Sequence, residues 1–266
     1  MRHEDEHQRT IIEQFSLQAL PFAAIPGHSA SIQVLIKMCG SAAMGDVLDV
    51  ACGPGIVACE FSPTARSVTG IDVTAAMIGA ARQRQLTQGL TNMEWIEGSA
   101  LALPFAERSF DAVVTRYSFH HFIEPARVLS EMIRVVRPGG RVLVADVAMP
   151  ASKVAEYDHL ETLRDPSHVH ALEVGEFEAL FLKSGLEALA SSSYEVRVEL
   201  EEQLRASFPN PGDADRIRQM CRSDIGQDRL GIGCHLDNEG ALHYSVPIRV
   251  LAGTREPGCV APQRRA

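Results

Sequence analysis

Residues 47–58 read VLDVACGPGIVA, and this stretch decides the fold. The apolar run Val47–Val50 is typical of a buried parallel strand, and it ends at a turn of small residues that leads into an apolar, helix-compatible segment. A strand that enters a helix through a turn without bulky side chains lets a ligand lie against bare backbone. We therefore expect Gly53 and Gly55 at positions where a Cβ atom would collide with a bound ligand.

An acidic residue ends the next strand-like run. This run is Ser67–Asp72, and Asp72 lies 19 residues after Gly53. A spacing of about 20 residues places an acid beside the ribose hydroxyls of an adenosine held on such a turn. The sequence therefore predicts a nucleoside site with Asp72 on the ribose; the alternative, a structural turn residue at a strand end, stays open.

Strand-like and helix-like segments alternate along the first 150 residues. We expect strands at 47–50, 67–72, 93–97, 110–115 and 141–146, with helices that include 74–88 and 125–136. This alternation predicts an α/β fold, a doubly wound, mostly parallel sheet with helices on both faces. The turns at 51–55, 72–73, 98–101 and 116–121 then share the carboxyl edge of the sheet, where ligands bind in such folds.

The remaining segments predict additions to this sheet. Helical spacing before the first strand indicates an N-terminal helical lid over residues 1–40. The main domain is expected over 41–254, and its last two strands enclose an insertion of about 201–240 that we expect to roof the ligand edge. A polar, flexible tail is expected over 255–266.

Composition narrows the class of protein. The chain has 266 residues, of which 45% are hydrophobic and 22% are charged, and this mixture is typical of a globular domain. Its formal net charge of −9 argues against nucleic acid as a partner. No apolar run is long enough to span a membrane, and the polar N-terminus predicts no signal peptide. Six scattered cysteines without a Cys-x-x-Cys pair predict reduced thiols, no metal site and a cytoplasmic protein.

Five motifs in order give the chain a resemblance to a known family. It resembles the class I S-adenosylmethionine-dependent methyltransferases, in particular the small-molecule group related to the ubiquinone/menaquinone C-methyltransferases. The resemblance covers residues 40–150, and the segment 163–169 also resembles a bacterial subgroup of this family. The motifs that carry it are Leu48–Gly55, Gly70–Asp72, Leu103–Phe105 before Ser109–Asp111, Phe119–Phe122 and Arg137–Arg141.

This resemblance implies a specific sheet and a cofactor. The sheet would have seven strands in the order 3-2-1-4-5-7-6, with the last strand antiparallel, and the cofactor would be S-adenosylmethionine. Gly53 and Gly55 would pass under its methionine part, while Asp49 would order the turn and reach its ammonium group. Two polar residues that follow the fourth strand, Arg116 and His121, are added to this set. The expected cofactor-binding residues are Asp49, Ala51, Cys52, Gly53, Gly55, Asp72, Val73, Met77, Ser99, Ala100, Leu101, Arg116 and His121.

Two of these residues depart from the family pattern. Ala51 stands where the family has the first glycine of the turn, and Ser99 stands where an acid often accepts a hydrogen bond from the adenine amino group. Adenine recognition would then rest more on the Ala100–Leu101 backbone. The cofactor affinity would be modest as a result.

Methyl transfer needs a base only where the acceptor must lose a proton. His120 lies just past the fourth strand, on the ligand edge, and histidine is the side chain that titrates near neutral pH. We expect His120 to act as the general base and His121 to contact the substrate or the cofactor. The alternative is that one of the two histidines caps the next helix or fills a polar pocket.

The acceptor itself is expected to be a small, planar or lipophilic molecule, because aromatic residues recur among the candidate lid and loop segments. No spacing of histidines demands a metal site. The residues expected to contact the substrate are Phe15, Phe22, His28, Tyr117 and His168.

Two other functions compete with methyl transfer. A nicotinamide-dependent oxidoreductase would need Gly-x-Gly-x-x-Gly at the turn, and neither reading frame of 51–58 keeps all three glycines. A non-catalytic protein that binds S-adenosylmethionine would need the same cofactor residues, so the motifs alone do not separate it from an enzyme.

Overall fold

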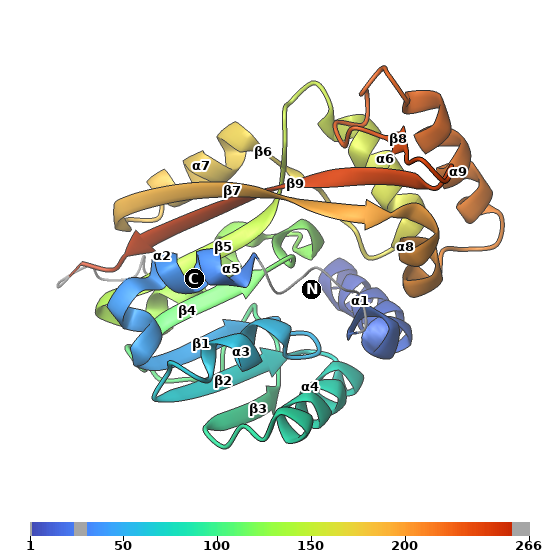
Figure 1. Cartoon of the computed structure of the whole chain (residues 1–266). Coiled ribbons are helices and arrows are strands. Elements are labelled where there is room, and N and C mark those ends of the chain that lie inside the picture. Colours follow the sequence, from blue (N-terminus) through green and yellow to red (C-terminus); the bar gives the residue numbers. More distant parts are fainter. Residues whose placement is uncertain (1, 24–30, 257–266) are drawn as a thin grey trace.

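A seven-stranded sheet with two short additions organises the computed structural model, which describes residues 2–23 and 31–256 (Figure 1). The order is β3-β2-β1-β4-β5-β9-β7, which is the predicted 3-2-1-4-5-7-6 when the long strands are counted along the chain. The first five strands are parallel, and β9 runs antiparallel to both β5 and β7. The predicted fold class is confirmed. The long strands are β1 (Asp46–Val50), β2 (Ser67–Asp72), β3 (Met93–Glu97), β4 (Phe110–Arg116), β5 (Val136–Met149), β7 (Glu187–Glu199) and β9 (Leu242–Thr254).

Helices and short elements complete the described chain. Two-residue strands extend the sheet at β6 (Leu172–Glu173), beside β5, and at β8 (His235–Leu236), beside β9. The α-helices are α1 (Arg2–Ala23), α2 (Ile32–Cys39), α3 (Ile56–Phe61), α4 (Ala75–Gln88), α5 (Pro125–Val135), α6 (Val154–Arg164), α7 (Val174–Leu182), α8 (Leu200–Ser207) and α9 (Asp213–Asp224). Short 3₁₀ helices are η1 (Gly40–Met44) and η2 (Phe119–His121).

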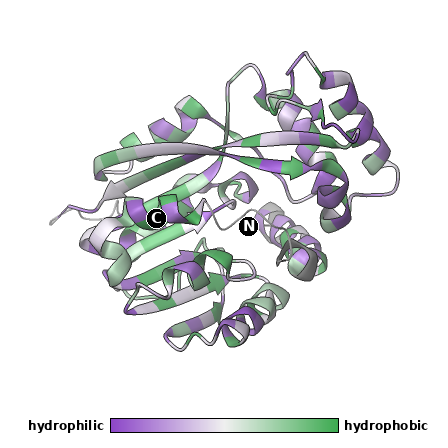
Figure 2. Ribbon diagram, in the orientation of Figure 1, coloured by the Kyte–Doolittle hydropathy of each residue, from purple (hydrophilic) through white to green (hydrophobic). Residues whose placement is uncertain are grey.

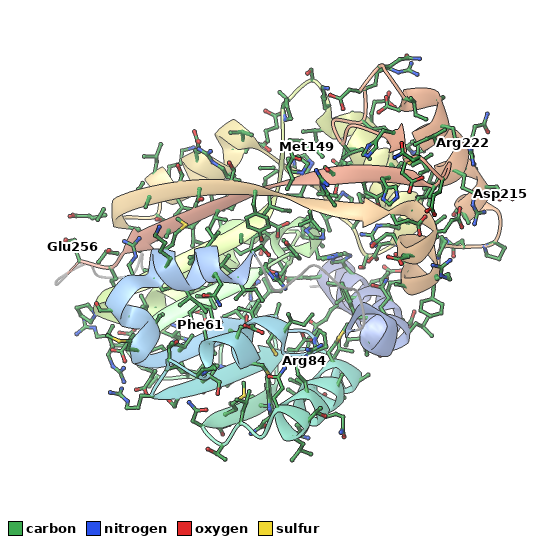
Figure 3. The ribbon with its side chains drawn as sticks, viewed as in Figure 1. Phe61, Arg84, Met149, Asp215, Arg222 and Glu256 are labelled. Atoms are coloured by element: carbon green, nitrogen blue, oxygen red, sulfur yellow. The ribbon has the colours of Figure 1, made fainter. Side chains whose placement is uncertain are left out.

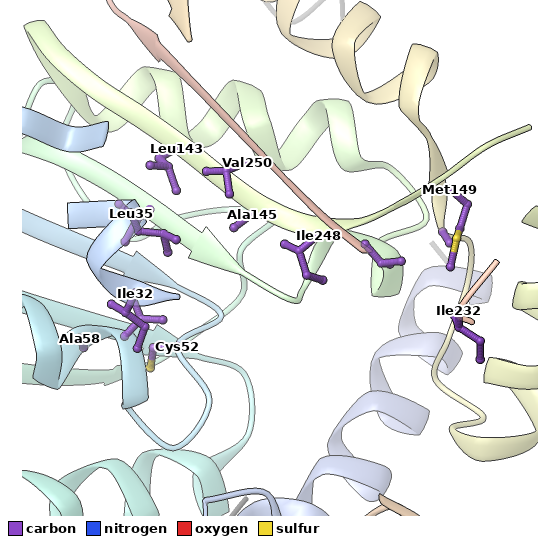
Figure 4. Packing of buried hydrophobic residues seen from close by; sticks show 14 of the residues in the cluster. Ile32, Leu35, Cys52, Ala58, Leu143, Ala145, Met149, Ile232, Ile248 and Val250 are labelled. Carbon is purple, nitrogen blue, oxygen red and sulfur yellow. The ribbon is translucent and has the colours of Figure 1, made fainter. Parts of the chain in front are cut away.

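Strand alternation builds one core on each face of the sheet. In β4, Ala112 and Val114 join a cluster with α2 and α3, whereas Val113 joins a second cluster with α5 and α7. This is the period of two expected for a sheet that is covered on both sides. Figure 4 shows part of the first cluster, in which Leu35 of α2 and Leu143 of β5 are fully buried.

Hydropathy follows this layering. Figure 2 shows apolar colouring in β4 and polar colouring along much of α9. Figure 3 shows Asp215 and Arg222 on α9 at the outer rim and Phe61 inside the molecule, where that ring is fully buried. Within the described residues, no helix has both the length and the apolar character that a membrane span requires.

The end of the domain lies slightly beyond the predicted limit of residue 254. Arg255 is buried, and its guanidinium donates to the carbonyl oxygens of Ile133, Arg134 and Val136 at 2.7–2.8 Å. These carbonyls belong to the last turn of α5 and the start of β5, where helix geometry leaves acceptors without partners. The packed part of the chain therefore includes Arg255.

Candidate active site

The turn between β1 and α3 adopts left-handed backbone geometry at three positions. Ala51, Gly53 and Gly55 have φ values of +52°, +51° and +75°. Glycine adopts this region freely, whereas an L side chain there costs about 1–2 kcal/mol. This geometry explains why the family pattern has glycine at the position of Ala51. The backbone N–H of Cys52 donates to the Ile71 carbonyl at 3.0 Å, which ties the turn to β2.

Gly55 is required by packing inside the protein. A Cβ atom on Gly55 would lie 2.6 Å from the Trp95 ring and 2.9 Å from the Ala81 Cβ atom. A Cβ atom on Gly70 would lie 2.4 Å from the same ring. Trp95 of β3 therefore lies against two glycines, and this contact was not foreseen from the spacing of the motif. At Gly53, by contrast, a Cβ atom would have only the Met77 sulfur near it, at 4.0 Å.

Two buried carboxylates hold the turn from either side. Asp72 Oδ2 accepts from the backbone N–H of Gly53, and its Oδ1 accepts from Thr74 at the start of α4, both at 2.9 Å. Asp49 Oδ2 accepts from the N–H of Ala58 in α3 at 3.0 Å. Burial raises the pKa of Asp49 to about 7, although the charge of nearby Arg116 and the bond from Ala58 oppose this shift. Burial also raises the pKa of Asp72.

A cleft of about 1180 Å³, including space open to solvent, lies on the carboxyl edge of the sheet beside this turn. All the residues predicted to bind the cofactor line it, with the exception of Gly55, which lies behind the surface of the cleft. The lining residues among the predicted set are Asp49, Ala51, Cys52, Gly53, Asp72, Val73, Met77, Ser99, Ala100, Leu101, Arg116 and His121.

The first helix covers the cleft. The sequence analysis singled out Phe15 on α1, but further α1 residues that it did not single out also line the cleft, namely Glu4, His7, Gln8 and Ile11. His7 Nε2 lies 2.8 Å from the carbonyl oxygen of His121, to which it can donate a hydrogen bond. The Glu4 carboxylate accepts from the Arg127 guanidinium at 2.8 Å. Helical spacing alone indicated an amphipathic segment but not which sheet edge it would cover.

A second cavity, of about 730 Å³ including space open to solvent, adjoins the cleft. Phe15, Tyr117 and His121 line both spaces and form their common wall. The remaining lining of the second cavity comes from α1, η2, the end of β5, α6, β7, α8 and β9. These residues are Gln18, His120, Asp146, Val147, Tyr157, Glu161, Arg164, Asp165, Val196, Val198, Gln203, Tyr244, Val246 and Ile248.

His120 forms a dyad with Asp146 in this second cavity. The His120 Nδ1 atom lies 2.6 Å from Asp146 Oδ1, and Asp146 also accepts from the backbone N–H groups of Ser118, Phe119 and Val147. Burial favours the neutral imidazole, but the charge and the hydrogen bond of Asp146 outweigh burial and raise the His120 pKa. Burial raises the pKa of the Asp146 carboxyl, but the charge of His120 and the hydrogen-bond donors around Asp146 outweigh this effect and lower the pKa. Because the ionised carboxylate only accepts, Nδ1–H points to Asp146 and Nε2 carries the lone pair of the neutral ring.

His121 is a neutral neighbour. Its Nδ1–H lies 2.9 Å from the carbonyl oxygen of Ser167, which accepts the hydrogen bond. Burial and the adjacent His120 lower the pKa of His121 to about 3. The two imidazole centroids are 4.1 Å apart, and the Phe15 ring meets His121 edge-on at 5.0 Å. His121 is therefore uncharged at neutral pH and forms part of the wall between the two cavities.

Arg116 and Tyr117 form the other part of this wall. Tyr117 has a φ of +56°, which turns the chain sharply at the end of β4. The Arg116 guanidinium lies 4.6 Å from the centre of the Tyr117 ring, at a distance suited to a cation–π contact. The Tyr117 hydroxyl lies 2.9 Å from that of Tyr194 on β7, so a hydrogen bond fixes the ring.

Of the other predicted substrate residues, His168 lies elsewhere, and the Phe22 side chain and His28 fall outside the described part of the structure. His168 is buried, its Nε2 is 2.7 Å from Asp158 Oδ1, and it does not line either cavity. The centre of its ring lies 5.6 Å from that of the His120 ring, and the two planes are tilted by 36°. Phe22 belongs to α1, but its side chain falls outside the described part of the structure, and His28 lies in the undescribed segment 24–30.

The strand order 3-2-1-4-5-7-6, with a cleft on the carboxyl edge of the sheet, is that of the class I methyltransferase fold. A family model described as a methyltransferase domain matches residues 48–144. The chain is 32% identical to the uncharacterized methyltransferase YcgJ of Bacillus subtilis over 70% of this chain and 74% of that protein. The crystal structure of the B. subtilis YcgJ protein superposes with a TM-score of 0.78, over 87% of this chain and all of that one, at 26% identity.

A quinone methyltransferase is also similar. The ubiquinone/menaquinone biosynthesis C-methyltransferase UbiE of Hahella chejuensis is 32% identical over 62% of this chain and 62% of its own length. The chain belongs to the class I S-adenosylmethionine-dependent methyltransferases, and S-adenosylmethionine is its cofactor.

The cleft suits this cofactor on structural grounds. Gly53 leaves open space where a side chain would intrude, and the carboxylates of Asp49 and Asp72 line the cleft, which suits a molecule with an ammonium group and two ribose hydroxyls. Asp49 and Asp72 would hold these groups, and Val73 and Met77 would pack on the adenine.

Proposed function

We propose that this enzyme methylates a small, planar, lipophilic molecule that is bound in the second cavity, with His120 as the general base. The observation that carries the proposal is the common wall of Phe15, Tyr117 and His121 between the cofactor cleft and the cavity that holds the His120–Asp146 dyad. A donor and an acceptor in adjoining spaces can meet at this wall.

The strand register explains the apolar floor of the second cavity. Val196 and Val198 of β7 pair with Val246 and Tyr244 of β9, and Ile248 of β9 pairs with Val147 of β5. Residues two apart on a strand point to the same face, so these side chains form one continuous surface. This surface favours a flat, apolar acceptor. The naming of UbiE as a quinone C-methyltransferase supports a ring compound of this kind.

The residues act mainly by orientation and by proton removal. When bound, S-adenosylmethionine would supply an electrophilic methyl group, which the acceptor takes in line with the S–CH3 bond as that bond breaks and S-adenosylhomocysteine leaves. Alignment of two reactants in a dry site lowers the barrier by several kcal/mol. His120 Nε2 takes the proton of the acceptor, and Asp146 holds the imidazole in the required tautomer and stabilises the imidazolium that results.

A pH–rate comparison tests His120. A panel of phenols and hydroquinones is assayed for methyl transfer with the parent, His120→Gln and Asp146→Asn. The parent rate should rise with pH through a His120 pKa above the ordinary value of about 6.5 and then level off. His120→Gln should lose about 10²–10⁴-fold in rate and the pH dependence with it. Asp146→Asn should lower the plateau and move the rise to lower pH.

The control for this comparison is His235→Gln, because His235 lies on β8, outside both cavities. This variant should keep the parent rate and profile. An unchanged rate and profile in His120→Gln would remove the general-base role but not the assignment as a methyltransferase.

A further inference from the structure

Among the residues that the structure describes, two tyrosine hydroxyls of the second cavity have no hydrogen-bond partner. Tyr157 of α6 and Tyr244 of β9 are each 3% exposed, and both line this cavity. Within residues 2–23 and 31–256, neither hydroxyl makes a hydrogen bond. Neither hydroxyl oxygen is among the fully buried unpaired polar atoms of the described residues, so each is open to the cavity, and a tyrosine hydroxyl at such a site usually finds a partner. Two such hydroxyls in one cavity therefore point to a polar group of a ligand.

The charged residues beside these tyrosines are already paired. The Arg164 guanidinium binds both carboxylate oxygens of Glu161, with Nε at 3.0 Å from each, and its NH1 donates to the Ser207 hydroxyl at 3.1 Å. The two charges cancel within the wall of the cavity. The ion pair therefore lies near the two tyrosines but makes no hydrogen bond with them. Because its charges cancel, it does not make the cavity favour a carboxylate ligand.

Both hydroxyls are held in the protonated form. Burial raises the pKa of Tyr157 and of Tyr244, and the Glu161 carboxylate raises both further. A protonated phenol can donate its hydrogen to an oxygen atom of a ligand. The two donors can act on the same ligand as the dyad, because His120 and Asp146 line the same cavity. The Tyr157 ring and the His120 ring lie 6.4 and 5.6 Å from the ring of His168, which is adjacent to both.

We propose that Tyr157 and Tyr244 donate hydrogen bonds to a carbonyl or enol oxygen of the methyl acceptor and stabilise the negative charge that this oxygen gains when His120 removes a proton. The inference rests on the proposed function. The proton moves to His120 Nε2, its electron pair stays on the acceptor, and conjugation carries the charge to the oxygen between the two phenols. The class of acceptor is thereby narrowed to an enolisable ketone, or to a hydroxylated ring that is conjugated with a carbonyl group.

A coloured phenol tests the oxyanion site directly. 4-Nitrophenol is titrated into the protein in the presence of S-adenosylhomocysteine, and the visible absorption of its phenolate reports the ionisation of the bound probe as a function of pH. In the parent, the bound probe should ionise at a lower pH than the free probe. One hydrogen bond to a charged group corresponds to about tenfold or more in an equilibrium constant. Tyr157→Phe and Tyr244→Phe should therefore each lower the ionisation constant of the bound probe about tenfold.

Thr87→Val is the control. It removes an exposed hydroxyl that donates to the Gln83 carbonyl on α4 and lies outside the lining of both cavities, so the ionisation of the probe should stay at the parent value. Calorimetry with S-adenosylhomocysteine shows for each variant whether the cofactor cleft is intact. Absence of bound phenolate in the parent, or the parent ionisation constant in the Tyr157→Phe/Tyr244→Phe double variant, would overturn the inference. Failure of the parent to bind S-adenosylhomocysteine would instead overturn the proposed function.

Discussion

At the scale of single residues, we expect Asp49 to make cofactor binding sensitive to pH. Its carboxyl is buried at the end of β1 and has a pKa of about 7, so it is protonated below this value and ionised above it. A cationic ligand binds the ionised form better and is therefore linked to release of this proton. We predict that the dissociation constant of S-adenosylhomocysteine, measured by calorimetry, increases as the pH falls below 7.

Asp49→Asn separates this effect from general acid instability. At pH 8 the variant should bind S-adenosylhomocysteine more weakly than the parent does. Its dissociation constant should not change with pH around neutrality, because the amide does not titrate. If the parent and Asp49→Asn showed the same dependence on pH, Asp49 would not be the group responsible.

Gly53 and Gly55 form a matched pair at the same turn. Alanine at either position bears the cost of positive φ, but only at Gly55 does the new Cβ meet Trp95 and Ala81. Overpacking of this kind costs about 1–3 kcal/mol. We predict that the free energy of unfolding, measured with urea, is about 1–3 kcal/mol lower for Gly55→Ala than for Gly53→Ala.

The affinity for S-adenosylhomocysteine should be reduced more by Gly53→Ala than by Gly55→Ala, which is the reverse of the order for stability. Gly53→Ala places a methyl group in the open cleft, so its affinity for S-adenosylhomocysteine should fall about tenfold or more, while Gly55→Ala should bind nearly as the parent once folded. Equal losses of stability with equal affinities would contradict the separate roles assigned to the two glycines.

At the scale of elements, α1 is held to the rest of the chain mainly by polar side chains. Gln14 donates to the Ser207 carbonyl at 2.7 Å, and Gln18 donates to Asp165 and Ser207 at 3.3 Å. By contrast, α5 buries six side chains between β4, β5 and their neighbours. We propose that α1 opens as a lid for cofactor exchange and closes over both cavities.

Hydrogen exchange tests the motion of α1. S-adenosylhomocysteine stabilises the closed state by mass action, by about 2.7 kcal/mol at a hundredfold excess over its dissociation constant, so exchange can slow up to about 100-fold. We predict slower exchange of backbone amides in α1 on addition of the ligand, and little change in α5, which serves as the internal control. Equal protection of both helices would argue against a separate opening of α1.

The sequence predicted some elements better than others for physical reasons. The parallel strands β1 to β5 are apolar runs bounded by turns, and such local patterns were sufficient to place the cofactor residues from Asp49 to His121 on one edge. Asp146 also ends the predicted strand 141–146, at the same edge as His120, so this placement could have suggested the dyad. Tyr244 could not be assigned to the cavity, because its neighbours depend on the long-range antiparallel register of β9.

For the whole molecule, the account depends on two joined cavities at one edge of the sheet. The first is built by the turn, β2 and α1, and the second by residues from β5, α6, β7, α8 and β9. Composition and spacing predicted most residues of the first cavity but only Phe15, Tyr117, His120 and His121 of the second, and they gave no volume for either. The common wall follows from the tertiary contacts of α1 and η2, which no local pattern encodes.

The most direct measurement is a crystal structure of the protein with S-adenosylhomocysteine. The account predicts the ribose on Asp72, the methionine part over Gly53, and the sulfur directed at the wall of Phe15, Tyr117 and His121, toward His120. A sulfur directed away from this wall, or a nucleoside bound outside the cleft, would contradict the assignment of the second cavity as the acceptor site.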